Sequence, residues 1–63
     1  VNEQDNQGNT MLHYAAWYGH LKTIKMLLKL GALPDIVNRE GRTPLHLAYS
    51  NSEMECHACL LEA

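Results

Sequence analysis

The stretch Thr43-Pro44-Leu45-His46-Leu47-Ala48 decides the fold of this chain, because a near copy, Thr10-Met11-Leu12-His13-Tyr14-Ala15, stands 33 residues earlier. The same shift places Gly8 on Gly41, and it places the pair Leu27-Leu28 on the pair Leu60-Leu61. A fixed period of this length is typical of repeat proteins, in which each unit stacks on the next. The chain is therefore predicted to contain two copies of one structural unit.

The motif Thr-Pro-Leu-His-x-Ala at a 33-residue period resembles the ankyrin repeat, and the resemblance covers nearly the whole chain. It implies an all-α fold, an ankyrin-repeat solenoid of stacked helix-turn-helix units with β-turn fingers between them. On this register, residues 1–4 are the tail of a preceding repeat, residues 5–37 are one repeat, and residues 38–63 are a second repeat truncated at its C-terminal end. We expect the chain to be an excerpt from a longer array or a larger protein.

Local signals agree with this register. Thr10 and Thr43 are good helix N-caps because a hydroxyl can accept a hydrogen bond from a free N–H of the first turn, and Pro44 suits the first helical position. Gly19 suits a left-handed residue that ends a helix at about position 18. Within residues 21–28, apolar residues recur at helical spacing, which predicts the second helix of the first unit.

Charges on the two second helices differ in sign. Lys22 and Lys29 correspond to Glu55 and Glu62 in the next unit. Because equivalent positions on stacked helices are neighbours, we expect two stripes of opposite charge to face each other. Exposed pairs of this kind contribute about 0–1 kcal/mol each, so they tune the register more than the stability.

Composition excludes several classes of function. The net charge of −2 and the near-neutral pI give no electrostatic basis for binding nucleic acid. The sequence has no apolar run long enough to span a membrane, and we expect no direct membrane contact. It shows no catalytic triad, carboxylate pair or phosphate-binding loop, so we expect no enzyme activity, no catalytic residue and no cofactor. Two cysteines without secretory features suggest an intracellular location, cytoplasmic or nuclear.

The segment Cys56-His57-Ala58-Cys59 allows three interpretations: a zinc site, a redox pair or part of the core. A structural zinc site needs four ligands, and the second cysteine pair that would complete it is absent from the sequence. Both cysteines fall on apolar positions of the repeat, which favours the core and predicts no metal site. His57 replaces the apolar Ile24, and it indicates either a partly exposed terminal helix or a contact outside the chain.

Function is then expected to come from the surface. The resemblance implies a concave groove, lined by finger tips and first helices, that binds a protein partner of unknown identity. The positions that line this groove, and that we predict to contact the partner, are Asn6, Gln7, Asn9, Trp17, Tyr18, Arg39, Glu40, Arg42, Ser50 and Asn51.

Trp17 and Tyr18 are the prominent members of this set, because adjacent aromatic residues cannot both point into a thin core. Trp17 either contacts the partner or packs against Tyr49 or the small Ala15-Ala16 stretch. The leading hypothesis is a scaffold or adaptor module. The alternative is an intramolecular regulatory or spacer segment of a larger enzyme or membrane protein. Because two units are few for such a stack, self-association through the exposed repeat ends is a further possibility.

Overall fold

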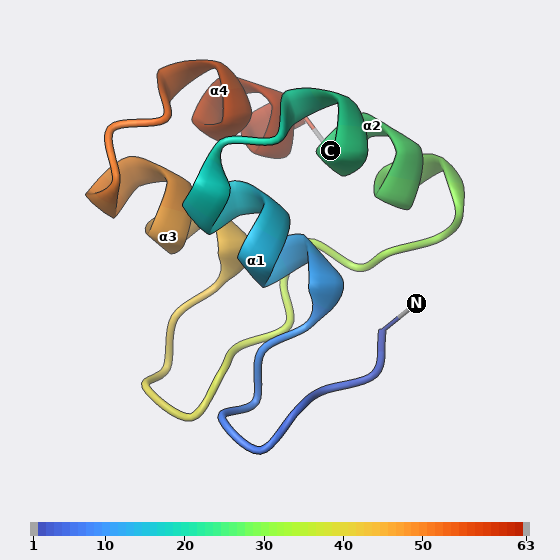
Figure 1. Ribbon diagram of the computed structural model, residues 1–63, viewed down its shortest axis with the longest axis vertical. Helices are drawn as coiled ribbons and strands as arrows, with labels where there is room; N and C mark the ends of the chain where they lie inside the picture. The colour runs from blue at the N-terminus through green and yellow to red at the C-terminus, as the bar shows by residue number, and fades with distance from the viewer. Residues whose placement is uncertain (1, 63) are drawn as a thin grey trace.

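The computed structural model describes residues 2–62 as four helices without a strand in that range. The first pair consists of α1 (Met11–Tyr18) and α2 (Leu21–Lys29), and the second of α3 (Pro44–Ser50) and α4 (Met54–Glu62). The helices lie in two layers, with α1 beside α3 and α2 beside α4, and two finger loops extend from the starts of α1 and α3 (Figure 1). The all-α solenoid of helix-turn-helix units is therefore confirmed.

Both first helices begin with the predicted threonine caps. The Thr10 hydroxyl accepts from the N–H of His13 at 3.4 Å, and the His13 Nδ1 accepts in turn from the N–H of Thr10 at 3.0 Å. Thr43 and His46 form the same reciprocal pair at 3.3 and 3.2 Å. The histidine of the motif thus takes the place that glutamate or glutamine holds in a usual capping box.

The ends of these helices share a left-handed residue. Gly19 follows α1 with φ of 74°, as predicted, and Ser52, the residue 33 positions later, has φ of 59°. Glycine adopts this conformation freely, whereas a Cβ atom makes it unfavourable. Sequence reasoning did not single out Ser52, because serine carries no signal for a left-handed turn.

The two fingers stack on each other through their backbones. Gly8 and Gly41 occupy equivalent positions of the two fingers and both have positive φ, 79° and 77°. Gly8 has a second reason to lack a side chain, since a Cβ there would lie 2.8 Å from the backbone nitrogen of Arg39 in the other finger. The N–H of Arg39 also donates to the carbonyl of Gln7 at 2.9 Å, which joins the two turns.

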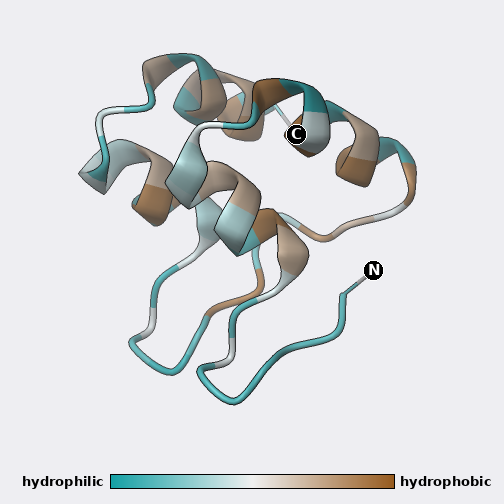
Figure 2. Cartoon of the chain, in the orientation of Figure 1, coloured by the Kyte–Doolittle hydropathy of each residue, from teal (hydrophilic) through white to brown (hydrophobic). Residues whose placement is uncertain are grey.

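The core lies between the two helix layers and draws on both repeats. Leu12 and Ile24 of the first repeat are completely buried, and Cys56 and Leu60 of the second are nearly so. Hydrophilic residues instead cover the finger tips (Figure 2). None of the helices within residues 2–62 combines the length and apolar character needed to cross a bilayer.

The α2–α4 contact differs from the predicted alignment of charges. The surface hollow that carries Glu55 and Glu62 is lined on the α2 side by Lys25, whereas Lys22 and Lys29 line a separate hollow. The reason is that facing sides of the two helices are not identical: the side of α2 that faces α4 carries Lys25, and the side of α4 that faces α2 carries Glu55. Glu55 and Glu62 therefore share a hollow with Lys25, which is offset by three or four residues from the positions equivalent to theirs.

Candidate partner-binding groove

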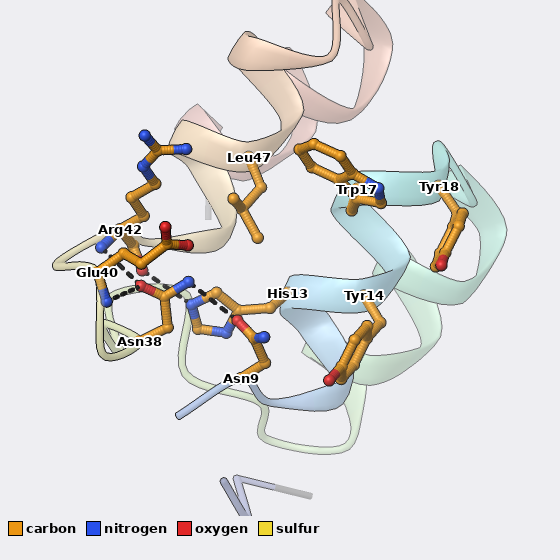
Figure 3. Close-up of a pocket in the computed structure, with 9 residues that line it drawn as sticks. All are labelled: Asn9, His13, Tyr14, Trp17, Tyr18, Asn38, Glu40, Arg42 and Leu47. Atoms are coloured by element: carbon orange, nitrogen blue, oxygen red, sulfur yellow. Dashed lines mark hydrogen bonds between the residues drawn. The ribbon is translucent and has the colours of Figure 1, made fainter. Parts of the chain in front are cut away.

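A hollow of about 400 Å³ lies where α1, α3 and the second finger meet (Figure 3). We call it the groove. Its lining combines aromatic, apolar, amide and charged side chains. The residues are Asn9, His13, Tyr14, Trp17, Tyr18, Asn38, Glu40, Arg42 and Leu47.

Trp17 and Leu47 form the apolar part of the groove. The Trp17 ring extends from α1 toward Leu47 of α3 (Figure 3). Leu47 is 7% exposed, whereas Trp17 remains 40% exposed. Neither sequence alternative describes Trp17 fully, because one part of its surface is covered and another part is open to a ligand.

Tyr14 and Tyr18 border the groove on the other side of α1. They point away from α3 (Figure 3), and both are exposed. With Trp17 they follow the spacing of one helix face, at positions i, i+3 and i+4. Tyr14 was missed from sequence because it occupies the variable position of the repeat motif, but its helical spacing from Tyr18 was a signal that could have identified it.

The second finger forms the polar wall of the groove, and Asn38 organises it. The Asn38 Oδ1 accepts from the N–H of Glu40 at 2.9 Å and from the N–H of Arg42 at 3.0 Å. The Asn38 Nδ2 donates to Asn9 Oδ1 of the first finger at 2.9 Å (Figure 3). Asn38 is buried, so this amide fixes the relative positions of three groove residues at once.

His13 joins α1 to the second finger. Its Nδ1 accepts from Thr10, so its Nε2 carries the proton and donates to the carbonyl of Arg42 at 3.0 Å. The side chain is completely buried. His13 therefore holds α1 against the finger of the next repeat.

Asp5 organises the first finger, as Asn38 organises the second. Its Oδ1 accepts from the N–H groups of Gln7 and Asn9, each at 2.9 Å, and its Oδ2 accepts from the Tyr14 hydroxyl. The bond from Tyr14 and the backbone donors lower the pKa of Asp5. The pKa of Tyr14 is raised, chiefly by this bond, while a hydrogen bond from the Asn9 side chain acts in the opposite direction.

The other predicted contact residues surround the groove without lining it. Asn6, Gln7 and Arg39 are exposed at the finger tips. Ser50 ends α3 and Asn51 follows it, and both are exposed. The Asn51 side chain donates to the carbonyl of Trp17, so it also connects the ends of α3 and α1. Of the ten predicted positions, the structure gathers Asn9, Trp17, Tyr18, Glu40 and Arg42 in the groove.

The cysteines lie away from the groove. Cys56 is buried, as the core interpretation predicted, and desolvation raises the pKa of its thiol. Cys59 is partly buried against the same core. Residues 2–62 hold no group of three side chains placed to bind a metal ion. The partly exposed ring of His57 lies 5.4 Å from the ring of Tyr49, measured between centroids.

Comparisons with known proteins give one consistent family. A family model described as "Ankyrin repeats (many copies)" matches residues 1–48, and another described as "Ankyrin repeat" matches residues 40–63. The chain is 56% identical over 48 residues to the transient receptor potential cation channel subfamily A member 1 homolog of Caenorhabditis elegans. That match covers 76% of this chain and 4% of the channel.

Two further relatives are of different kinds. The chain is 43% identical over 54 residues to the E3 ubiquitin-protein ligase XB3 of Oryza sativa subsp. japonica, a match that covers 86% of this chain and 12% of the ligase. It is also 45% identical over 49 residues to Rabankyrin-5 of Mus musculus. That match covers 78% of this chain and 4% of Rabankyrin-5. The chain thus spans only a small part of the length of the curated relatives that it matches.

Proposed function

The chain belongs to the ankyrin repeat family, whose repeats are protein-interaction modules and are not themselves catalytic, and from this premise we propose that it binds a protein partner through the groove. The contact surface in this proposal consists of the groove residues together with the finger tips and the end of α3. The chain acts as a scaffold or adaptor segment, and the chemistry of any larger protein resides outside it.

The observation that carries the proposal is the half-covered Trp17 beside the buried Leu47. Tryptophan, tyrosine and arginine are the residues that most often dominate binding energy at interfaces, and the groove contains all three types. A hollow of about 400 Å³ also lies within the size range of ligand sites, and it accommodates one or two side chains of a partner.

The second candidate is an intramolecular role, in which the groove binds another part of the same polypeptide. The relatives support it, since one is named as a cation channel and another as a ubiquitin ligase, and the matched segment is a small part of each. We also propose an intracellular setting, because Cys56 and Cys59 are free thiols.

Selection of peptides from a random display library on the 63-residue chain tests the proposal. Affinities of the selected peptides are then measured for Trp17→Ala and Tyr18→Ala variants. Tyr49→Ala is the matched control, because Tyr49 and Tyr18 are both 64% exposed and Tyr49 lies outside the groove. Loss of an interface anchor costs about 2 kcal/mol or more, so we expect at least a tenfold weaker affinity for Trp17→Ala.

Circular dichroism establishes that each variant keeps its helices. Unchanged affinities in folded Trp17→Ala and Tyr18→Ala variants would contradict the proposed site. Hydrogen exchange on the full-length polypeptide separates the two roles. Protection of the groove amides without any added partner indicates the intramolecular role, and protection only after adding a partner indicates the adaptor role.

A further inference from the structure

We propose that the chain associates with copies of itself head to tail, so that the second repeat of one copy covers the first repeat of another. Two outer surfaces take part, one at each end of the two-repeat stack (Figure 1). The α1–α2 face consists of Met11, Tyr14, Tyr18, Thr23 and Met26. The α3–α4 face consists of His46, Tyr49, Met54, Ala58 and Leu61. The proposal is independent of the groove.

The α1–α2 face is the counterpart of a surface that the first repeat covers in the second. After a shift of 33 residues, its members fall on Pro44, Leu47, Asn51, Cys56 and Cys59. Leu47 meets the Trp17 ring, the Asn51 side chain donates to the Trp17 carbonyl, and Cys59 shares a hollow with Leu21 of α2. In the first repeat, the large apolar residues at these positions are exposed, and they border a hollow of about 320 Å³. The face therefore has the form of a repeat surface without its cover.

The α3–α4 face is the counterpart of the surface that does the covering. His13, Ala16 and Trp17 share one side of α1, and this side lies against α3, because His13 and Trp17 both bond to the second repeat. Leu21 and Lys25 share the side of α2 that faces α4. The equivalent positions of the second repeat, with Leu61 two turns after Met54, make up the α3–α4 face. Its large apolar residues, Tyr49, Met54 and Leu61, are exposed.

Two hydrogen bonds fix the direction of stacking within the chain. The N–H of Arg39 in the second finger donates to the carbonyl of Gln7 in the first, and His13 Nε2 donates to the carbonyl of Arg42. Each bond joins a group on the outgoing side of the first repeat to a group on the incoming side of the second. A further unit that stacks in the same direction forms the same two bonds.

The groups for these two bonds are present at the ends of the chain. On the incoming side they are the Asn6 N–H and the Asn9 carbonyl, and on the outgoing side the Glu40 carbonyl and His46 Nε2. Among the described residues, Asn6 N–H, Glu40 carbonyl and His46 Nε2 have no hydrogen-bond partner, and the Asn9 carbonyl accepts only from the N–H of Asp5. Because His46 Nδ1 accepts from its N-cap, its Nε2 carries the proton. A second copy of this chain therefore supplies a donor for each acceptor.

Tyr49 makes this contact weaker than the one within the chain. It stands at the position of Ala16, which is completely buried on the side of α1 that lies against α3. A close-packed alanine leaves no room for a ring at the same helix separation. The Tyr49 ring lies beside His57 of α4, with 5.4 Å between ring centroids. Two copies therefore have to meet at a greater separation, and their association is reversible.

Sedimentation velocity over a concentration series of the 63-residue chain tests the proposal. A head-to-tail contact leaves one free face at each end, so we expect species larger than a dimer as the concentration rises. Tyr49→Ala restores the small residue of the first repeat and should strengthen association about tenfold. Removal of an exposed ring would instead weaken a non-specific apolar contact. Peptide affinities for this variant are measured at concentrations where it is monomeric.

Met26→Glu and Leu61→Glu each block one face, and both positions are exposed, so the helices should be retained. Each variant alone should be monomeric. An equimolar mixture should form a dimer and no larger species, because the intact α3–α4 face of one variant binds the intact α1–α2 face of the other. Trp17→Ala, which alters the groove, is the control and should associate like the wild type.

Several outcomes would overturn the proposal, provided that circular dichroism shows folded variants. A wild-type chain that stays monomeric up to its solubility limit contradicts association. Loss of association in only one of the two glutamate variants means that one face pairs with itself, which contradicts the head-to-tail arrangement. Weaker association of Tyr49→Ala contradicts packing that follows the contact between the repeats. Loss of peptide binding in Trp17→Ala concerns the groove alone, so the two proposals fail separately.

Discussion

At the scale of single residues, Ser52 holds a conformation that its repeat counterpart Gly19 adopts without cost. Both residues turn the chain between the helices of one repeat, with φ of 59° and 74°. A non-glycine residue in the left-handed region costs about 1–2 kcal/mol. The first repeat therefore has the better turn residue, and the second repeat carries a local cost at the equivalent place.

The Ser52→Gly variant should be more stable than the wild type. The relief of the left-handed conformation outweighs the greater flexibility of glycine in the unfolded chain, which leaves a gain of about 0.5–1 kcal/mol. Urea unfolding measures this gain. The reverse exchange, Gly19→Ser, is the control and should be destabilising by about 1–2 kcal/mol, because a Cβ is unfavourable at φ of 74° and the Glu53 side chain would have to move aside. A Ser52→Gly variant that unfolds more easily than the wild type would contradict the role of the turn.

The hydrogen bond between Tyr14 and Asp5 makes stability depend on pH at both ends of the range. The folded-state pKa of Asp5 lies below its ordinary 3.8, so this contribution is present above that value and is lost as pH falls through the folded pKa. The folded-state pKa of Tyr14 lies above its ordinary 10.0, so its contribution is present below that value and is lost as pH rises through the folded pKa.

The Asp5→Asn variant should therefore have a flatter profile of thermal midpoint against pH than the wild type. The change should be seen below about pH 4 and above about pH 10, where the two groups titrate. Asparagine preserves the finger turn, as Asn38 does in the second finger. Parallel profiles for the two proteins at both extremes would show that this hydrogen bond does not contribute to stability.

At the scale of elements, the two motif histidines have the same local role but different surroundings. His13 and His46 each complete a capping box at the start of a first helix. His13 is completely buried and also bonds the carbonyl of Arg42 in the second finger, whereas His46 is exposed. One of the two histidines therefore connects repeats, and the other serves its own helix.

Glutamine substitution should separate these roles. A glutamine at this position of a capping box retains the bond to the N-cap N–H, so the cap survives in both variants. His46→Gln should change the free energy of unfolding by less than about 0.5 kcal/mol, as is usual at exposed positions. His13→Gln loses the bond to Arg42 and should cost about 1–2 kcal/mol. Equal costs in urea unfolding would mean that the bond between the repeats does not stabilise the chain.

The elements were predictable from sequence because their signals are local. Thr10, Pro44 and Gly19 act within one helical turn, and the structure places each where its chemistry required. The groove was only half predictable, since Leu47 and Tyr14 occupy equivalent positions and differ in what covers them. Leu47 is buried beneath the first repeat, whereas Tyr14 is exposed. Whether this position is buried depends on the unit that packs against it. Burial of this kind cannot be predicted from the residue type alone.

At the scale of the whole molecule, the two repeats share one core. Leu12 and Ile24 come from the first repeat and Cys56 and Leu60 from the second, and they belong to the same buried cluster. In repeat proteins, the free energy of unfolding is approximately the sum of the intrinsic stability of each unit and the interaction free energy of each interface between neighbouring units. With two units, unfolding of one removes the whole interface from the other. The chain should therefore unfold in a single step.

The Cys56→Ala variant tests this step with a probe in the other repeat. Cys56 is 2% exposed in α4, and the loss of its buried sulfur should cost about 1 kcal/mol, which is mild enough to keep the protein folded. Trp17 fluorescence reports the first repeat and its contact with Leu47 of the second, and far-ultraviolet circular dichroism reports the helices of both. If the repeats unfold together, the substitution lowers the urea midpoint of both signals equally, although Trp17 lies on α1. A fluorescence midpoint that stays at the wild-type value while the dichroism midpoint falls would show that the first repeat folds without the second. The groove would then lose Leu47 and the second finger while Trp17 remained in a folded unit, so cooperativity determines whether the groove exists as one site.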